Sequence, residues 1–242
     1  MMRYNNFFLL LLCLVPGVIN ASQEPKVYNN VTDSAIVKKC SDFQVTGNGN
    51  SSQWTNTDWI NLIPQEGAVS QYTTRVKVLH SETGMYFLFS CGDKKITSAM
   101  KADNLNLWEE DVVEVFLWPD ESFPVYFEYE LSPMNFELPI IVPNKKGSFL
   151  GWLPWHYDGD RKTQHSTSLI KDKDGAVSGW YAEFFIPFKL LTPLIQVPPA
   201  AGNKWRANMY RIDYDNGQVP FSWQNTETTF HEYNKFGTFI FR

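Results

Sequence analysis

Apolar and polar residues alternate with a period of two along most of this chain, and no other sequence feature constrains its fold as strongly. Successive side chains of a strand point to opposite faces, whereas a helix needs apolar residues every three to four positions. The alternating segments, rich in aromatic and β-branched residues, are 74–79, 85–91, 111–117, 125–131, 180–186, 205–214 and 236–241. Turn sequences such as Ser81-Glu82-Thr83-Gly84 and Lys173-Asp174-Gly175 separate them, because Gly supplies the positive φ of a hairpin. We therefore predict an all-β protein, a single β-sandwich of jelly-roll or immunoglobulin-like type with antiparallel sheets.

The composition favours one core and argues against two classes of partner. Among 242 residues there are 9 Trp, 11 Tyr and 18 Phe, which is enough apolar bulk for one substantial domain. The formal net charge is -5, and no cluster of Lys and Arg stands out. Nucleic-acid affinity depends on counterions released when basic side chains neutralise phosphates. We therefore expect neither a nucleic acid nor an anionic membrane as a partner.

The N-terminus has the pattern of a secretory signal peptide. Arg3 precedes an apolar run at 7–15, which is too short to span a bilayer. Cleavage after Ala21 would remove residues 1–21 and leave 22–242 as a single domain with no membrane span. We therefore expect the protein to be secreted, to reside in a periplasm or to act at the cell surface.

Two cysteines, Cys40 and Cys91, remain in the mature chain and would meet an oxidising compartment. We expect them to form a disulfide, which on the chain-entropy model would stabilise the fold by about 4 kcal/mol. The alternative is two separately buried thiols. Neither cysteine has a neighbouring His, so we expect no zinc site.

Alternation also places charged residues on particular faces of the predicted strands. Glu114 shares a strand face with apolar residues on both sides, and Glu128 and Glu130 share one face of the next strand. Further along the chain, Arg211 lies on the face opposite Tyr210. Acids and an Arg among aromatic rings can fix sugar hydroxyls while the rings cover the apolar face of a pyranose. The alternative is a solvated sheet face in which Arg211 is a structural ion-pair partner.

Five sequence blocks, in order along the chain, resemble carbohydrate-binding module family 9. They are LWEEDVVEVFL at 107–117, YFEYEL at 126–131, GWYAEFFIP at 179–187, WRANMYRID at 205–213 and FHEYNKFG at 230–237. The resemblance extends from about Trp54 to Arg242, nearly the whole mature chain. It implies a β-sandwich that binds sugars between two aromatic side chains without cleaving them.

The resemblance also implies roles for individual residues. Trp108 matches the first clamp aromatic, Glu114 the acid that bonds sugar hydroxyls, and Phe230 the second clamp aromatic, which is a Trp in the best-known members. Tyr210 stands where such members have an amide side chain, and Glu128 where they have an Arg. The predicted carbohydrate-binding residues are thus Trp108, Glu114, Glu128, Tyr210, Arg211 and Phe230. We expect no cofactor. Some members of the family bind calcium, which leaves a structural calcium ion as an open alternative, but no compact Asp-x-Asp-x-Asp loop assigns a site for it.

Two main function classes follow from these residues, besides an adhesion or structural role. The first is an exported, non-catalytic protein that binds an oligosaccharide or polysaccharide. The second is a small glycoside-active enzyme using Glu128 and Glu130, whose Cβ atoms would lie about 7 Å apart, a separation that overlaps the carboxylate spacing of inverting glycosidases. Two acids side by side on one strand do not flank a bond from opposite faces, so we predict a binding protein and no enzyme. Trp152, Trp155 and Tyr157 stand in a loop that either rims the sugar site or packs over a sheet edge.

Overall fold

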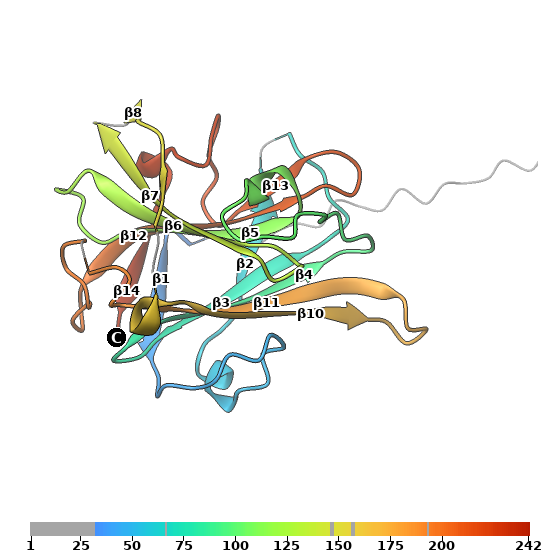
Figure 1. Ribbon diagram of the computed structural model, residues 1–242, viewed down its shortest axis with the longest axis horizontal. Coiled ribbons are helices and arrows are strands. Elements are labelled where there is room, and N and C mark those ends of the chain that lie inside the picture. The colour runs from blue at the N-terminus through green and yellow to red at the C-terminus, as the bar shows by residue number, and fades with distance from the viewer. Residues whose placement is uncertain (1–31, 66, 146–147, 156–157, 193) are drawn as a thin grey trace, which may run out of the picture.

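Two β-layers pack face to face in the computed structural model of the protein (Figure 1). The structure describes residues 32–65, 67–145, 148–155, 158–192 and 194–242. The predicted signal peptide, residues 1–21, lies outside this part of the chain and stays a prediction.

Neighbouring strands within each layer are antiparallel. The first layer contains, in order, β10 (Gln164–Lys171), β11 (Val177–Pro187), β4 (Gly84–Gly92) and β3 (Thr74–His80). The second contains β14 (Gly237–Phe241), β12 (Lys204–Asp213), β5 (Val112–Trp118), β6 (Val125–Leu131) and β7 (Glu137–Lys145). The short strands β8 (Ser148–Phe149) and β9 (Leu153–Pro154) pair with β7.

Two further strands join the layers at their edges. β1 (Ser34–Lys39) runs parallel to β14 and then to β3, while β2 (Ile60–Pro64) is antiparallel to β3 and to β13 (Val219–Ser222). Single 3-10 turns lie between strands: η1 (Ser52–Asn56), η2 (Leu107–Glu109), η3 (Gly159–Arg161) and η4 (Tyr233–Lys235). The predicted all-β sandwich is confirmed, with the difference that β1 makes parallel pairs.

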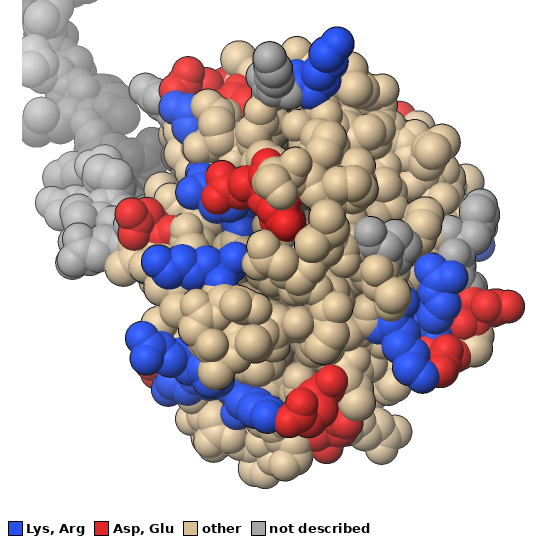
Figure 2. All heavy atoms as spheres, turned by 90° about the vertical axis from the view of Figure 1, so that its left-hand side faces the viewer, with Lys and Arg blue, Asp and Glu red and all other residues tan. Residues whose placement is uncertain are grey.

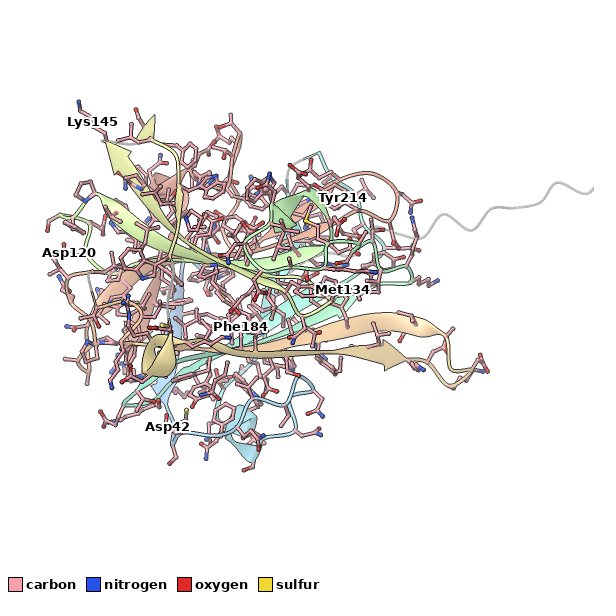
Figure 3. The ribbon with its side chains drawn as sticks, in the orientation of Figure 1. Asp42, Asp120, Met134, Lys145, Phe184 and Tyr214 are labelled. Carbon is pink, nitrogen blue, oxygen red and sulfur yellow. The ribbon has the colours of Figure 1, made fainter. Side chains whose placement is uncertain are left out.

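Alternation along the strands of the second layer separates an inner from an outer face. Val113, Val115 and Leu117 of β5 are buried in the core between the layers. Tyr129 of β6 meets Phe184 of β11 there, with ring centroids 4.7 Å apart, and Figure 3 shows Phe184 between the layers. The intervening residues of β5 and β6 must therefore point to the outer face, where a second apolar cluster lies.

The predicted disulfide between Cys40 and Cys91 is wrong, because both thiols are free. Cys91 pairs with Thr74 at one end of β3, whereas the Cys40 N–H donates to the carbonyl of His80 at the other end, at 2.8 Å. Strand geometry puts these ends about 20 Å apart, far beyond the roughly 7 Å between Cα atoms that a disulfide tolerates. Burial raises the pKa of Cys40 to about 11 and that of Cys91 to about 12, so both thiols stay protonated.

No helix among the described residues is long and apolar enough to cross a membrane. On the face of the molecule in Figure 2, Lys and Arg side chains lie beside Asp and Glu rather than in a separate basic patch. That face therefore presents no broad positive field of the kind that attracts a polyanion.

Candidate functional site

A cavity of about 470 Å³ lies on the outer face of the second layer. Strands β5, β6, β7 and β12 contribute to it, together with η2 and loops that are far apart in the sequence. Its lining residues are Gln65, Trp108, Glu114, Phe116, Glu128, Glu130, Ile140, Phe149, Trp152, Ile212, Gln218, Pro220, Thr228, Thr229, Phe230 and His231. The volume is in the range of sites for small ligands.

Trp108 is fixed in the cavity wall by contacts of its backbone and its ring. It lies in η2, just before β5, and is half-buried. The hydroxyl of Tyr214, labelled in Figure 3, donates to the Trp108 carbonyl at 2.7 Å. The Trp152 ring meets the Trp108 ring edge-on, with centroids 5.5 Å apart and planes at 77°. Both contacts restrict the indole before any ligand arrives, which lowers the entropy cost of binding.

Phe230 is held on the same cavity by a stack on β12. Its ring lies over that of Tyr210, with centroids 4.0 Å apart and planes at 11°. The Tyr210 hydroxyl donates to the Phe230 carbonyl at 2.9 Å, and the Asn208 amide donates to that hydroxyl at 2.6 Å. Tyr210 is fully buried and does not line the cavity, so it positions Phe230 rather than offering a surface to a ligand.

Three carboxyl groups from adjacent strands line the cavity. Glu114 of β5 pairs directly across from Glu130 of β6, and Glu128 lies two residues away on the same face of β6. The three residues are only 2%, 1% and 4% exposed, respectively. Burial raises the pKa of Glu114 to about 8. Burial, together with the neighbouring carboxyls, raises the pKa values of Glu128 and Glu130 well above the ordinary range.

The carboxyl group of Glu130 is poorly satisfied by the protein. Neither of its oxygens meets hydrogen-bond geometry with another described group. One oxygen of Glu114 and one oxygen of Glu128 likewise meet no such geometry. The Glu128 carboxyl and the Trp108 backbone are close enough to influence the pKa of Glu130. Because buried polar groups are nearly always bonded, these oxygens are available to a ligand or to water.

His231 adds a ring but no positive charge at neutral pH. Its Nδ1 lies 2.7 Å from the Tyr126 hydroxyl and 3.8 Å from Oε2 of Glu128. The Phe149 ring stacks on the imidazole, with centroids 4.2 Å apart and planes at 18°. Burial lowers the pKa of His231 to about 4, so the imidazole is neutral at pH 7. No Lys or Arg is among the described residues that line the cavity.

Arg211 lies away from the cavity, and this corrects its predicted place in the sugar site. It is on the opposite face of β12 from Tyr210 and is fully buried. Its Nη2 is 2.8 Å from Oδ2 of Asp93, and its Nη1 donates to the Gly92 carbonyl at 2.7 Å. The sequence pattern correctly placed Arg211 on the strand face opposite Tyr210. Its role is the structural ion pair that the sequence left open as the alternative to sugar binding.

Asp93, Asp111 and Asp213 are a carboxylate cluster around Arg211 that the sequence did not indicate. One oxygen from each lies within 4.8 Å of the others, as in a calcium site. The guanidinium already supplies the positive charge, because Nη2 of Arg211 is 2.8 Å from Asp93 and 3.8 Å from Asp213. Asp111 accepts from the backbone N–H groups of Thr97 and Tyr214 at 2.6 and 2.9 Å. These residues therefore do not fit calcium while Arg211 is in place.

Four of the six predicted site residues line the cavity: Trp108, Glu114, Glu128 and Phe230. Sequence reasoning missed His231 and Phe149 as lining residues, because both stand in segments without a periodic pattern. Alternation placed Glu130 with Glu128 on a strand face suited to sugar hydroxyls, but Glu130 was not among the six predicted residues; it lines the cavity as well.

The three residues of the aromatic loop have different outcomes. Trp152 lines the cavity, as one of the two alternatives expected. Trp155 packs against the core, and its indole N–H donates to the Leu190 carbonyl at 3.0 Å. Tyr157 lies outside the described residues.

A family model described as carbohydrate family 9 binding domain-like matches residues 45–242 of the chain. A comparison with curated proteins returned no match. Among solved structures, a candidate carbohydrate-binding protein from Bacteroides uniformis ATCC 8492 is similar with a TM-score of 0.70 and 16% identity, over 86% of this chain and 99% of that one.

A carbohydrate binding module family 9 from Caldicellulosiruptor kristjanssonii is also similar, in complexes with cellotriose and with glucose. Both comparisons give a TM-score of 0.63 and 16% identity over 86% of this chain, and they cover 93% and 95% of those chains. At this identity the likeness concerns the fold, which is the same β-sandwich.

Proposed function

The chain belongs to the carbohydrate family 9 binding domain-like family, and on that premise we propose that it is an exported, non-catalytic protein that binds carbohydrate. The ligand is one or two sugar units of an oligosaccharide or polysaccharide, held beside Trp108 and Phe230. One observation carries the proposal: both of these rings and three carboxyl groups line the same cavity.

The chemistry of the cavity suits a sugar. Flat rings cover the apolar C–H face of a pyranose, while the carboxyl groups of Glu114 and Glu128 accept or donate hydrogen bonds at its hydroxyls. The family 9 module of Caldicellulosiruptor kristjanssonii, of the same fold, is known in complex with cellotriose and with glucose. That relative supports a hexose-based ligand for this chain.

The arrangement of the acids favours binding over hydrolysis. Glu114, Glu128 and Glu130 all come from one wall of the cavity, on adjacent strands of the same sheet. A glycosidase needs carboxyl groups that flank the scissile bond, with one of them ionised as base or nucleophile. Burial raises the pKa values of all three and holds them in the protonated form near neutral pH. Export rests on the signal-peptide pattern of residues 1–21.

The test compares two half-buried tryptophans. Trp108→Ala removes a cavity ring, whereas Trp59→Ala removes a ring that packs on Arg75 away from the cavity. We expect wild-type protein and Trp59→Ala to retain labelled oligosaccharides on a glycan array, Trp108→Ala to lose retention, and both variants to keep a cooperative melting curve. Equal retention by Trp108→Ala would overturn the site. New reducing ends after incubation with the bound glycan would show that the protein is an enzyme.

A further inference from the structure

We propose that the cavity selects sugars that carry a protonated amine, such as hexosamines without an N-acetyl group, over neutral and acidic sugars. The proposal rests on the proposed carbohydrate-binding function and names its substrate class. It is carried by three buried carboxyl groups in a cavity whose described lining includes no Lys or Arg.

The first step is the balance of charge in the lining. Three carboxyl groups face one cavity, and Glu114 and Glu130 are direct cross-strand neighbours, a position in which like charges repel. The described lining has no Lys or Arg, and the imidazole of His231 is neutral near pH 7 because burial lowers its pKa. The described lining therefore offers no cation to a carboxylate, and burial keeps its glutamates protonated. An ammonium group that enters the cavity supplies that positive charge, so it lowers the pKa of a neighbouring carboxyl group and pairs with its ionised form.

The second step is the unmet hydrogen bonding. Both Glu130 oxygens, Oε1 of Glu114 and Oε2 of Glu128 are buried and meet hydrogen-bond geometry with no described protein group, although the Trp108 backbone and the Glu128 carboxyl lie close to Glu130. An ammonium group offers three N–H donors and one positive charge, while a sugar hydroxyl offers one donor and no charge. Hydrogen bonds to charged groups are about twice as strong as neutral ones. An amine at this position thus satisfies several acceptors at once.

The third step concerns whether the cavity suits an ammonium group or a bare metal ion. The set of described carboxylates whose oxygens come within 4.8 Å of one another is Asp93, Asp111 and Asp213, and the cavity glutamates are not in it. The three glutamates thus do not converge on one point as the ligands of a bare metal ion do, whereas the separate N–H groups of an ammonium can reach different carboxyl groups. The indole of Trp108, on the same cavity, also attracts a cation over its face.

The experiment uses three disaccharides with the same β-1,4 linkage: glucosamine disaccharide, its N-acetylated form and cellobiose. Calorimetry at pH 6.5 measures the dissociation constant of each for the mature protein. We expect the free amine to bind at least tenfold more tightly than cellobiose, which is about 1.4 kcal/mol. The acetylated form should lose this gain, because it keeps the nitrogen but not the charge.

Variants then assign the gain to the carboxyl groups. Glu130→Gln is isosteric. It should bring the ratio of the affinity for the glucosamine disaccharide to the affinity for cellobiose near one, and it should change the affinity for cellobiose itself less than threefold. Glu114→Gln should lower the same ratio, and Glu121→Gln, an exposed change, should leave it unaltered. Melting curves establish that each variant is folded.

The outcomes distinguish this proposal from the proposed function. If cellobiose binds as well as the amine, or if Glu130→Gln weakens both sugars alike, amine selection is overturned while carbohydrate binding stands. If no sugar binds, both proposals are overturned. Calorimetry with Ca²⁺ alone is the remaining arm: binding of calcium that Glu130→Gln abolishes would overturn amine selection in favour of a metal site.

Discussion

Glu114→Gln should raise the stability of the protein at alkaline pH and leave it almost unchanged at acidic pH. Burial raises the pKa of Glu114 to about 8, from an ordinary value of 4.5. An acid with a raised pKa in the folded state stabilises the fold below its ordinary pKa, and that stabilisation is lost as the pH rises toward the folded pKa. The described titratable groups that interact with Glu114 from neighbouring elements are Glu130, Glu128, Tyr210 and Tyr214, and none of these four is a cation.

The size of the effect follows from proton linkage. Between pH 5 and pH 8 the carboxyl group is ionised in the unfolded chain but largely protonated in the folded one, over about 2.5 pH units. Each unit corresponds to about 1.4 kcal/mol, so the free energy of unfolding should fall by about 3 kcal/mol across this window. For a domain of this size that is a decrease of roughly 6 to 12 °C in melting temperature.

Urea unfolding of wild-type protein, Glu114→Gln and the exposed control Glu121→Gln at pH 5 and pH 8 measures the effect. We expect Glu114→Gln to match the wild type at pH 5 and to exceed it by about 3 kcal/mol at pH 8, because glutamine has no proton to lose. The control should follow the wild type at both values. Parallel pH profiles for wild type and Glu114→Gln would refute the reasoning, since they would mean that folding leaves the ionisation of this carboxyl group unchanged.

Three further predictions concern the interior. Mass spectrometry of denatured, unreduced mature protein should find Cys40 and Cys91 both alkylated, and a mass two hydrogens lower would show that they are bridged after all. Arg211→Ala should cost about 3–5 kcal/mol in urea unfolding because it leaves Asp93 buried without its partner, and EDTA should leave the wild-type melting temperature unchanged. A lower melting temperature in EDTA would mean that the aspartate cluster holds a metal ion.

Alternation predicted the central strands and the faces of their side chains because strand geometry fixes both. β5 and β6 begin within one residue of their expected starts, and Glu114, Glu128 and Glu130 lie together on the outer face. β7 was missed because Pro139 and Pro143 interrupt its pattern. The carbonyls of both prolines accept from Trp155 and Leu150 on the outer side of the strand. Each missing N–H therefore faces away from β6, and the pairing of β6 with β7 survives.

Other features depend on distances that no local pattern encodes. Cys40 and Cys91 both suit an oxidising compartment, and the sequence therefore favoured a disulfide. In the fold, Cys91 of β4 pairs with the first residue of β3, whereas Cys40 lies beside the last residue of β3. Phe149 of β8 and His231, in the segment before η4, are about eighty residues apart and stack on each other only in the folded chain. The sequence thus predicts which strand residues share a face, while the closure of the cavity depends on tertiary packing.

The number of sugar units that the cavity holds leads to the last prediction. Two units have about 23 heavy atoms, and at roughly 0.3 kcal/mol per atom they gain about 7 kcal/mol, a dissociation constant near ten micromolar. The same estimate for one sugar unit gives a dissociation constant in roughly the millimolar range. Trp108 and Phe230 are each fixed by neighbouring side chains, so the contact area should not grow as the glycan lengthens.

We therefore expect affinity to rise from one sugar unit to two and to level off beyond two or three, in a calorimetric series of increasing chain length. Phe230→Trp should tighten binding, because the indole covers more of a pyranose, provided that the stack on Tyr210 accommodates it. Phe230→Ala should abolish binding, with Trp59→Ala as the unaffected control. Affinity that keeps climbing with every added unit would instead show an open groove, in which these two rings are only part of a longer binding surface.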